Sequence, residues 1–141
     1  MSVTFHTEEV QFHLEQRRLH KQWVKEWIRL HHKTPGSISF VFTSNERIKI
    51  INQEYLNHNY FTDVISFDYT EGNLISGDIV ISVEEVKKNA EFYHTDLHEE
   101  LRRVMIHGVT HLLGYSDGTA EEKEIMRKKE NEALHLWMKL V

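Results

Sequence analysis

Proline and glycine are scarce in this chain, which contains one proline and six glycines among its 141 residues. Because these two residues are the strongest interrupters of regular structure, the stretches between them are free to form long elements. Runs rich in β-branched and aromatic residues predict strands, and runs with apolar residues three or four positions apart predict amphipathic helices. The two kinds of run alternate along the chain, which predicts a mixed α and β structure.

The expected elements follow from these periodicities and from the polar residues that typically begin helices. Strands are expected at residues 3–6, 37–43, 63–69 and 78–82, and helices are expected to begin near Glu8, Thr43, Ser82, Asp96 and Thr119. The turn at residues 35–36, Pro-Gly, is predicted to follow a first helix over residues 8–32. The last two strands are predicted to pair antiparallel. Four strands and about five helices indicate a single α+β domain with a small mixed sheet.

The composition excludes several classes of protein. The chain has 17 Lys plus Arg and 22 Asp plus Glu, so its net charge is −5, and it has no cysteine. Disulfide frameworks, cysteine zinc sites and thiol nucleophiles are therefore excluded, and a reducing cytoplasm is expected. Neither a membrane span nor a signal peptide is expected from the sequence. The acidic balance argues against a broad basic face, so any affinity for nucleic acid has to come from a local patch.

The most informative stretch is residues 107–117, His-Gly-Val-Thr-His-Leu-Leu-Gly-Tyr-Ser-Asp. On a helix, His107 and His111 lie one turn apart on the same face and can bind one metal ion. Gly114 can adopt the left-handed conformation that ends a helix, so that the chain folds back and Asp117 can supply a third ligand. Two imidazoles and a carboxylate suit one Zn²⁺ ion with its fourth position left to water, an arrangement used for hydrolysis.

Each of these features also has a simpler explanation. A pair of histidines at this spacing can arise by coincidence in a chain with 11 His, and Gly114 and Asp117 could simply end a helix and begin a loop. Gly108 stands where zinc peptidases carry a catalytic glutamate, so peptidase chemistry is disfavoured, and it predicts a closely packed neighbour. The other nine His are not assigned to the site, and His31 and His32 are expected at a solvated helix end.

The motifs resemble those of the YbeY endoribonucleases, single-domain bacterial proteins with a zincin-like mixed sheet. Their signature, His-Gly-x-x-His-Leu-x-Gly-Tyr-Asp-His, is matched from position 107 through position 115. Two further family blocks occur upstream in the family order: residues 52–55 (Asn-Gln-Glu-Tyr) with residues 62–67 (Thr-Asp-Val-Ile-Ser-Phe), and residues 77–82 (Gly-Asp-Ile-Val-Ile-Ser). The resemblance covers nearly the whole chain beyond about residue 37.

The resemblance implies one metallohydrolase domain over residues 1–141, acting as a zinc-dependent, single-strand-specific endoribonuclease. Its implied roles are rRNA processing, including 16S rRNA 3′-end maturation, and ribosome quality control, with the ribosome or its small subunit as a partner. His107, His111 and Asp117 would be the ligands of one zinc ion. Asp63 and Ser66 would line the cleft, and no catalytic group is assigned beyond a metal-bound water. Asp78 is expected to orient backbone or neighbouring polar groups.

Four positions depart from the family pattern. Asp117 stands in place of the third histidine, and Ser116 stands in place of the aspartate before it. The carboxylate lowers the net charge of the metal centre by one, which predicts a less acidic bound water. Leu56 replaces an arginine of the family cleft and Phe61 replaces a proline, so an expected phosphate contact is missing.

Other residues could supply that contact. Arg103 lies one helical turn before His107 and is predicted to contact a phosphate; the alternative is a solvent-facing ion pair with Glu99. The remaining candidates for phosphate or base contacts are Lys87, Lys88, Arg127, Lys128, Lys129, Tyr55, Tyr60 and Phe61. Two other functions stay open at this point. One is a non-catalytic ribosome-assembly factor stabilised by its metal, and the other is a metallohydrolase with another substrate or with Fe(II) as its metal.

Overall fold

The computed structural model describes residues 2–56 and 62–141, and the statements below refer to these residues. Five helices and four strands alternate in a mixed order within them, which confirms the predicted α+β class. The elements are β1 (Val3–Thr7), α1 (Arg17–Leu30), β2 (Thr34–Thr43), α2 (Asn45–Leu56), β3 (Val64–Asp68), β4 (Leu74–Ser82), α3 (Val83–Tyr93), α4 (Leu97–Leu112) and α5 (Ala120–Leu140).

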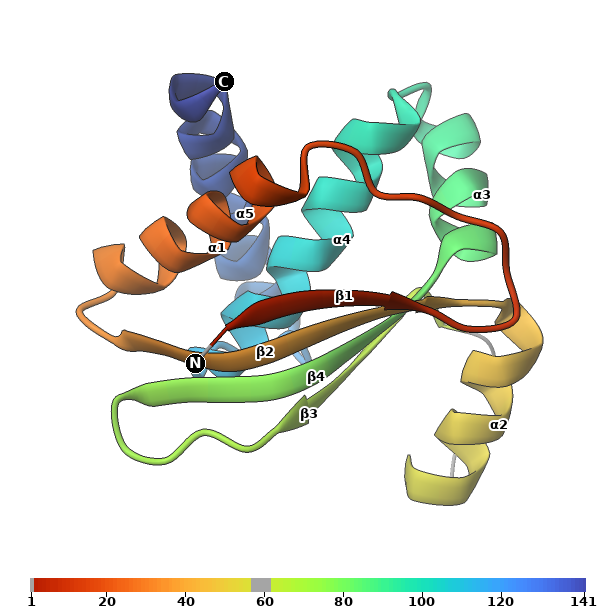
Figure 1. The fold of residues 1–141 in the computed structure, drawn as a ribbon, viewed down its shortest axis with the longest axis horizontal. Coiled ribbons are helices and arrows are strands. Elements are labelled where there is room, and N and C mark those ends of the chain that lie inside the picture. Colours follow the sequence, from red (N-terminus) through yellow and green to blue (C-terminus); the bar gives the residue numbers. More distant parts are fainter. Residues whose placement is uncertain (1, 57–61) are drawn as a thin grey trace.

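The four strands form one mixed sheet in the order β1-β2-β4-β3. Parallel pairing joins β1 to β2 and β2 to β4, and antiparallel pairing joins β3 to β4. The register places Phe40 of β2 opposite Ile79 of β4, and Ile79 opposite Ser66 of β3. Strand β3 therefore lies at one edge of the sheet (Figure 1).

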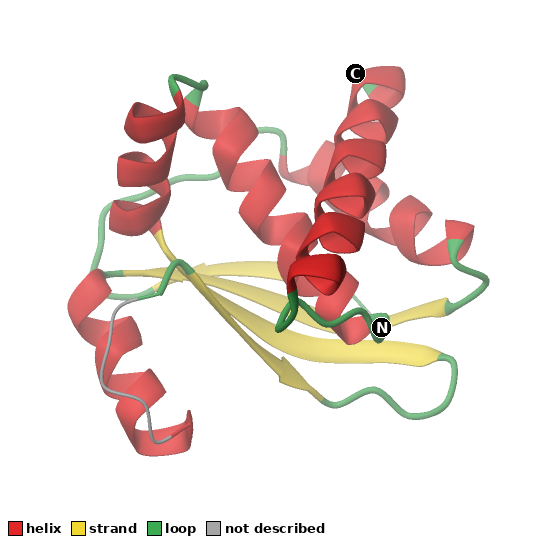
Figure 2. Cartoon of the chain, turned by 180° about the vertical axis from the view of Figure 1, so that it is seen from behind, coloured by secondary structure: helices red, strands yellow, loops and turns green. Residues whose placement is uncertain are grey.

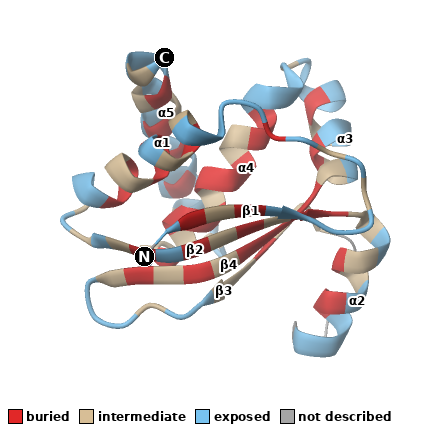
Figure 3. Cartoon of the chain, viewed as in Figure 1, coloured by how far each residue is buried: buried red, intermediate tan, exposed pale blue. Residues whose placement is uncertain are grey.

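The helices are divided unequally between the two faces of this sheet. Figures 1 and 2 show α1, α3, α4 and α5 on one face and α2 alone on the other. Side chains of a strand alternate between faces, so Ile79 and Ile81 enter the main core while Val80 packs with Ile48 and Ile51 under α2. Figure 3 shows the same division, with buried residues along the strands and on the inner side of α4.

The largest difference from the sequence prediction concerns the first helix. It was predicted over residues 8–32, but α1 begins at Arg17 and a loop precedes it. Because β1 and β2 are parallel, the chain has to return to the starting end of the sheet, and this loop carries it from the end of β1 to the helical layer (Figure 1). Leu14 is buried from the loop, and the Phe12 ring centroid lies 5.0 Å from that of Phe42. The apolar spacing that predicted a helix here reflects loop residues packed on the core.

The turn predicted at residues 35–36 is also displaced. The chain turns at His31 and His32, where His32 has a φ of 60°, and Pro35 lies inside β2. The pairing of β2 with β4 is irregular between Pro35 and Ile38. This irregularity accommodates a residue that has no N–H group for the strand ladder.

Most of the predicted helix starts are confirmed. The side chains of Ser82, Asp96 and Thr119 each accept hydrogen bonds from backbone N–H groups in the first turn of the following helix. The start of α2 differs by one residue, because Ser44 Oγ, and not Thr43, accepts the bond from the N–H of residue 47. These caps fix where α3, α4 and α5 begin, and with them the position of the residue 107–117 motif on α4 and the loop after it.

Candidate metal centre

Helix α4 lies unusually close to the sheet at Gly108. A β-carbon built on this residue would lie 2.7 Å from Cγ2 of Ile79 and 3.1 Å from Oγ of Ser66. Ser66 also donates its hydroxyl hydrogen to the Gly108 carbonyl at 3.3 Å. The close neighbour predicted for Gly108 is therefore β4. The close approach of α4 to the sheet also places His107 and His111 beside strand β3.

The chain reverses after α4 at Gly114, as the sequence predicted. Gly114 has a φ of 103°, its N–H donates to the His111 carbonyl at 3.0 Å, and the Tyr115 N–H donates to the Thr110 carbonyl at 3.3 Å. This pair of bonds is the usual way in which a glycine closes a helix C-terminus. The loop that follows returns Asp117 to the histidine face of α4.

The three predicted ligands are brought together by this turn. His107 Nε2 lies 3.0 Å from His111 Nε2, and Asp117 Oδ2 lies 3.1 Å and 3.4 Å from these two atoms. In the part of the chain that the structure describes, they are the one group of three or more His, Cys, Asp or Glu residues that could hold a metal ion. Ligands around a tetrahedral ion with bonds of about 2.1 Å lie about 3.4 Å apart, so the observed separations of 3.0, 3.1 and 3.4 Å are close to those around such an ion.

The other nitrogen of each imidazole is held by an acceptor. His111 Nδ1 donates to the Tyr115 carbonyl and His107 Nδ1 donates to Oε2 of Glu130, both at 2.8 Å. Both partners are hydrogen-bond acceptors, so the ring hydrogen of each neutral imidazole is on Nδ1. The Nε2 lone pairs of both rings therefore point to the space that they share with Asp117 Oδ2. Two lone pairs and a carboxylate oxygen that face one another are stabilised by a cation between them. The donor set therefore fits a divalent metal.

Glu130 of α5 is the main outer partner of this group. It is 7% exposed, and its Oε1 lies 3.0 Å from Nη1 of Arg103. Burial disfavours the charged forms of both His107 and Glu130, but their mutual hydrogen bond and opposite charges outweigh it, raising the pKa of His107 and lowering the pKa of Glu130.

Sequence analysis did not identify Glu130. The signal was present, because Glu130 lies on the apolar stripe of α5 between Met126 and Ala133, both of which are buried. An acidic residue at a position that periodicity assigns to the core is a candidate for a specific buried partner.

Comparison with known proteins supplies the family. The family described as Endoribonuclease YbeY matches residues 2–138. The chain belongs to this family. Curated proteins named Endoribonuclease YbeY are similar to it: that of Parabacteroides distasonis is 45% identical over 134 residues, covering 95% of this chain and 94% of that protein. That of Bacteroides fragilis is 43% identical over 134 residues, covering 95% and 96%.

Family membership makes the protein an endoribonuclease, a hydrolase that acts on RNA. The fold agrees with that of a solved structure, the solution structure of TM1509 from Thermotoga maritima. The TM-score is 0.64 at 23% sequence identity, with 97% of this chain and 92% of that chain covered. Among the described residues, no helix combines the length and the apolar character that crossing a membrane would require.

In this YbeY-family protein the candidate ligands His107, His111 and Asp117 line a cleft of about 470 Å³. Asp63 and Ser66, which the family resemblance places at the cleft, both line it. Burial raises the pKa of Asp63, and its Oδ2 accepts a hydrogen bond from Asn89 at 3.1 Å. Asp78 is not among the lining residues; it accepts a hydrogen bond from the Tyr69 hydroxyl at 3.3 Å.

Arg103 turns toward α5. Its two terminal nitrogens lie 3.0 Å from Glu130 Oε1 and 3.0 Å from Asn131 Oδ1, so its ion pair is with Glu130 and not with Glu99. The predicted contact between Arg103 and a phosphate stays a prediction. The side chain of Arg127 is 56% exposed beside the same glutamate.

The other proposed RNA contacts are scattered over the surface. Lys129 lies over the Tyr115 ring at 5.2 Å from its centroid, and Lys88 pairs with Glu85 at 3.4 Å. Tyr55 is 67% exposed. Tyr60 and Phe61 lie outside the described residues.

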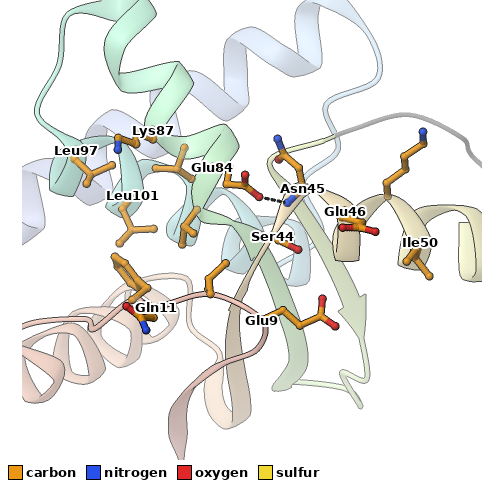
Figure 4. A pocket seen from close by; sticks show the side chains of 15 residues that line it. Glu9, Gln11, Ser44, Asn45, Glu46, Ile50, Glu84, Lys87, Leu97 and Leu101 are labelled. Atoms are coloured by element: carbon orange, nitrogen blue, oxygen red, sulfur yellow. Dashed lines mark hydrogen bonds between the residues drawn. The ribbon is translucent and has the colours of Figure 1, made fainter.

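A larger cavity, of about 1090 Å³, lies away from the histidines. It is bordered by the loop after β1 and by the first turns of α2, α3 and α4, and no described residue lines both it and the metal cleft (Figure 4). Its polar groups are partly paired with one another, since the Asn45 N–H donates to Glu84 Oε1 at 2.7 Å. No group with metal-ligand geometry lies there among the described residues. The candidate site is therefore the smaller cleft.

Proposed function

We propose that the protein is a zinc-dependent, single-strand-specific endoribonuclease of the cytoplasm that acts on ribosomal RNA. Its proposed tasks are maturation of the 16S rRNA 3′ end and ribosome quality control. The observation that carries the proposal is the convergence of His107 Nε2, His111 Nε2 and Asp117 Oδ2 within 3.4 Å of one another at the cleft. Zinc is the metal of choice because two imidazoles and one carboxylate, with no cysteine in the chain, match its ligand preferences.

A bound divalent ion would supply Lewis acidity toward a phosphoryl oxygen and toward water. The chain itself orients the ligands: Glu130 and the Tyr115 carbonyl fix the two imidazole rings, and the Gly114 turn holds Asp117 against them. A phosphodiester can enter the cleft readily when its strand is unpaired, because flexible single strands can splay their bases aside. This supports a preference for single-stranded RNA.

The decisive experiment compares the wild type with His111→Ala on single-stranded rRNA and on the same sequence in a duplex. We expect zinc-loaded wild type to cut the single strand and His111→Ala to lose cleavage, since one of three ligands is gone. His98→Ala is the matched control, because His98 is an exposed histidine on the same helix. Circular dichroism verifies that all variants are folded.

The rival functions give different results in the same experiment. Equal cleavage by wild type and His111→Ala would mean that a contaminating nuclease cuts the RNA, and would refute the metal mechanism. RNA binding without cleavage by metal-loaded wild type would favour a non-catalytic ribosome-assembly factor.

Elemental analysis of protein purified without added metal distinguishes zinc from iron. Accumulation of small-subunit RNA with an unprocessed 3′ end in cells that carry only His111→Ala would support the proposed ribosomal role.

A further inference from the structure

A smaller cavity adjoins the metal centre. It has a volume of about 170 Å³ and is bordered by α3, α4 and α5. His107, Asp63 and Val64 line both this cavity and the metal cleft. A ligand in the smaller cavity would therefore lie next to a phosphodiester held at the metal centre.

The most unusual residue of this cavity is Glu100, a buried carboxylate. It lines the cavity from α4 and is only 6% exposed. Over residues 2–56 and 62–141 its carboxylate has neither a hydrogen bond nor an ion pair, whereas Glu130 in the same cavity is bonded to His107 and Arg103. Burial raises the pKa of Glu100, and the nearby charges of Arg103 and Arg127 offset this effect only in part. A buried, unpartnered acceptor that faces a cavity points to a ligand with N–H donors.

The rim of the cavity adds a cation and an aromatic ring. Nη1 of Arg127 lies 3.7 Å from Glu130 Oε1, beyond ordinary hydrogen-bond distance, and the Arg127 side chain is 56% exposed. Its N–H groups can therefore serve a ligand. Tyr93, the last residue of α3, lines the same cavity and is 55% exposed.

The carboxylate, the guanidinium and the aromatic ring that line this cavity can be matched with the hydrogen-bonding edges of the four RNA bases. Proteins read unpaired bases by stacking them on aromatic rings and by bonding their Watson–Crick and Hoogsteen edges. A carboxylate can accept two parallel bonds from guanine, whose Watson–Crick edge carries adjacent N1–H and N2–H donors; the other three bases present a single donor group to it. Arginine in turn donates to the O6 and N7 acceptors of guanine. The combination of Glu100, Arg127 and Tyr93 fits guanine.

We propose that this cavity, the Glu100 pocket, binds the guanine base of a nucleotide next to the bond that is cut. Glu100 accepts from N1–H and N2–H, Arg127 donates to O6 or N7, and Tyr93 stacks on the ring. The role of the pocket in RNA cleavage rests on the proposed function. Its ability to bind a guanine nucleotide can be measured without any cleavage.

The first test measures binding of the four nucleoside 5′-monophosphates by titration calorimetry with metal-loaded protein. We expect the guanine nucleotide to bind about tenfold more tightly than the other three, the discrimination typical of a good bidentate contact. Glu100→Gln should abolish this preference, because an amide presents one acceptor and one donor where the base needs two acceptors. Glu99→Gln is the matched control, since Glu99 is the exposed neighbour on the same helix.

A second pair of variants tests the stacking contact independently. Tyr93→Ala should weaken binding of the guanine nucleotide several-fold, and Tyr93→Phe, which keeps the aromatic ring, should largely retain it. The pocket proposal is overturned if all four nucleotides bind equally to wild type, or if Glu100→Gln keeps the preference.

Cleavage mapping on single-stranded RNA of mixed sequence separates this proposal from the proposed function. Cuts next to guanine in wild type that lose this preference in Glu100→Gln support the pocket. Efficient cutting without any base preference refutes the pocket and leaves the nuclease assignment standing. Binding of the guanine nucleotide that Glu100→Gln abolishes, in a protein that cuts no RNA with any metal, supports the pocket and refutes the nuclease.

Discussion

At the scale of single residues, the candidate metal centre depends on groups that are distant in sequence from the three candidate ligands. His107 receives its orientation from Glu130, which lies 23 positions further along the chain on α5. Arg103 donates to Oε1 of Glu130 and thereby orients the carboxylate, whose Oε2 accepts the hydrogen bond from His107 Nδ1. Such outer partners fix both the tautomer and the angle of a ligand imidazole.

We therefore predict that Glu130→Gln weakens zinc binding by about 10- to 100-fold, the usual effect of removing such a partner. The amide keeps the size of the side chain but loses the charge that favours the Nδ1–H tautomer of His107. Competition with a fluorescent zinc chelator measures the affinity. Glu132→Gln is the control on the same helix, since Glu132 is exposed and pairs with Lys129. An unchanged zinc affinity in Glu130→Gln would contradict the assigned role.

At the scale of elements, the site depends on how closely α4 approaches the sheet. The approach requires Gly108, and Ile79 below it is fully buried. The caps of α3, α4 and α5 and the Gly114 turn could be predicted from sequence, because each depends on residues a few positions apart. The start of α1 could not, because the loop before it carries apolar residues at helical spacing and only the parallel pairing of β1 with β2 requires a loop there.

Gly108→Ala tests the close approach. The new methyl group would lie 2.7 Å from Ile79 Cγ2, so we expect overpacking to cost about 1–3 kcal/mol and the higher helix propensity of alanine to return about 1 kcal/mol. The free energy of unfolding should therefore fall by about 1 kcal/mol, as measured by urea denaturation without metal. Gly118→Ala should have little effect, because the nearest neighbour of the new methyl group would be a glutamate oxygen at 3.5 Å, an ordinary van der Waals distance. A Gly108→Ala variant more stable than wild type would contradict the close packing.

At the scale of the whole molecule, an aromatic cluster joins the first helix to the last. His20 of α1 is 2% exposed, and its ring centroid lies 4.5 Å from that of Trp137 on α5. Trp23 donates its ring N–H to the Ala133 carbonyl at 2.7 Å. Burial lowers the pKa of His20 from 6.5 to about 4. His31, expected at a solvated helix end, is half-buried, with its ring centroid 4.5 Å from that of Trp27.

This buried histidine predicts a loss of stability in acid. His20 is neutral in the folded protein down to about pH 4, whereas in the unfolded chain it gains a proton below about pH 6.5. Its contribution is therefore complete above pH 6.5 and lost as the pH falls toward 4, by up to about 3 kcal/mol. Urea unfolding of metal-free protein at pH 7.5 and 4.5 measures the effect.

The contribution of His20 is isolated by a variant that cannot titrate. The loss of stability between the two pH values should be smaller in His20→Asn than in wild type, because the asparagine side chain does not titrate. His13→Asn, at an exposed histidine, should keep the wild-type dependence. Identical pH profiles for wild type and His20→Asn would contradict the assignment.

The sequence by itself determined the α+β class, most of the helix starts, and the pairing of His107 and His111 with Asp117 through the Gly114 turn. These features are local, because capping, turn chemistry and helical periodicity act over a few residues. The tertiary structure alone decided where α1 begins, which acid orients His107, and that Glu100 lines a cavity with no partner among the described residues. Each of these depends on which surfaces pack together, and periodicity along one chain does not specify contacts between distant helices.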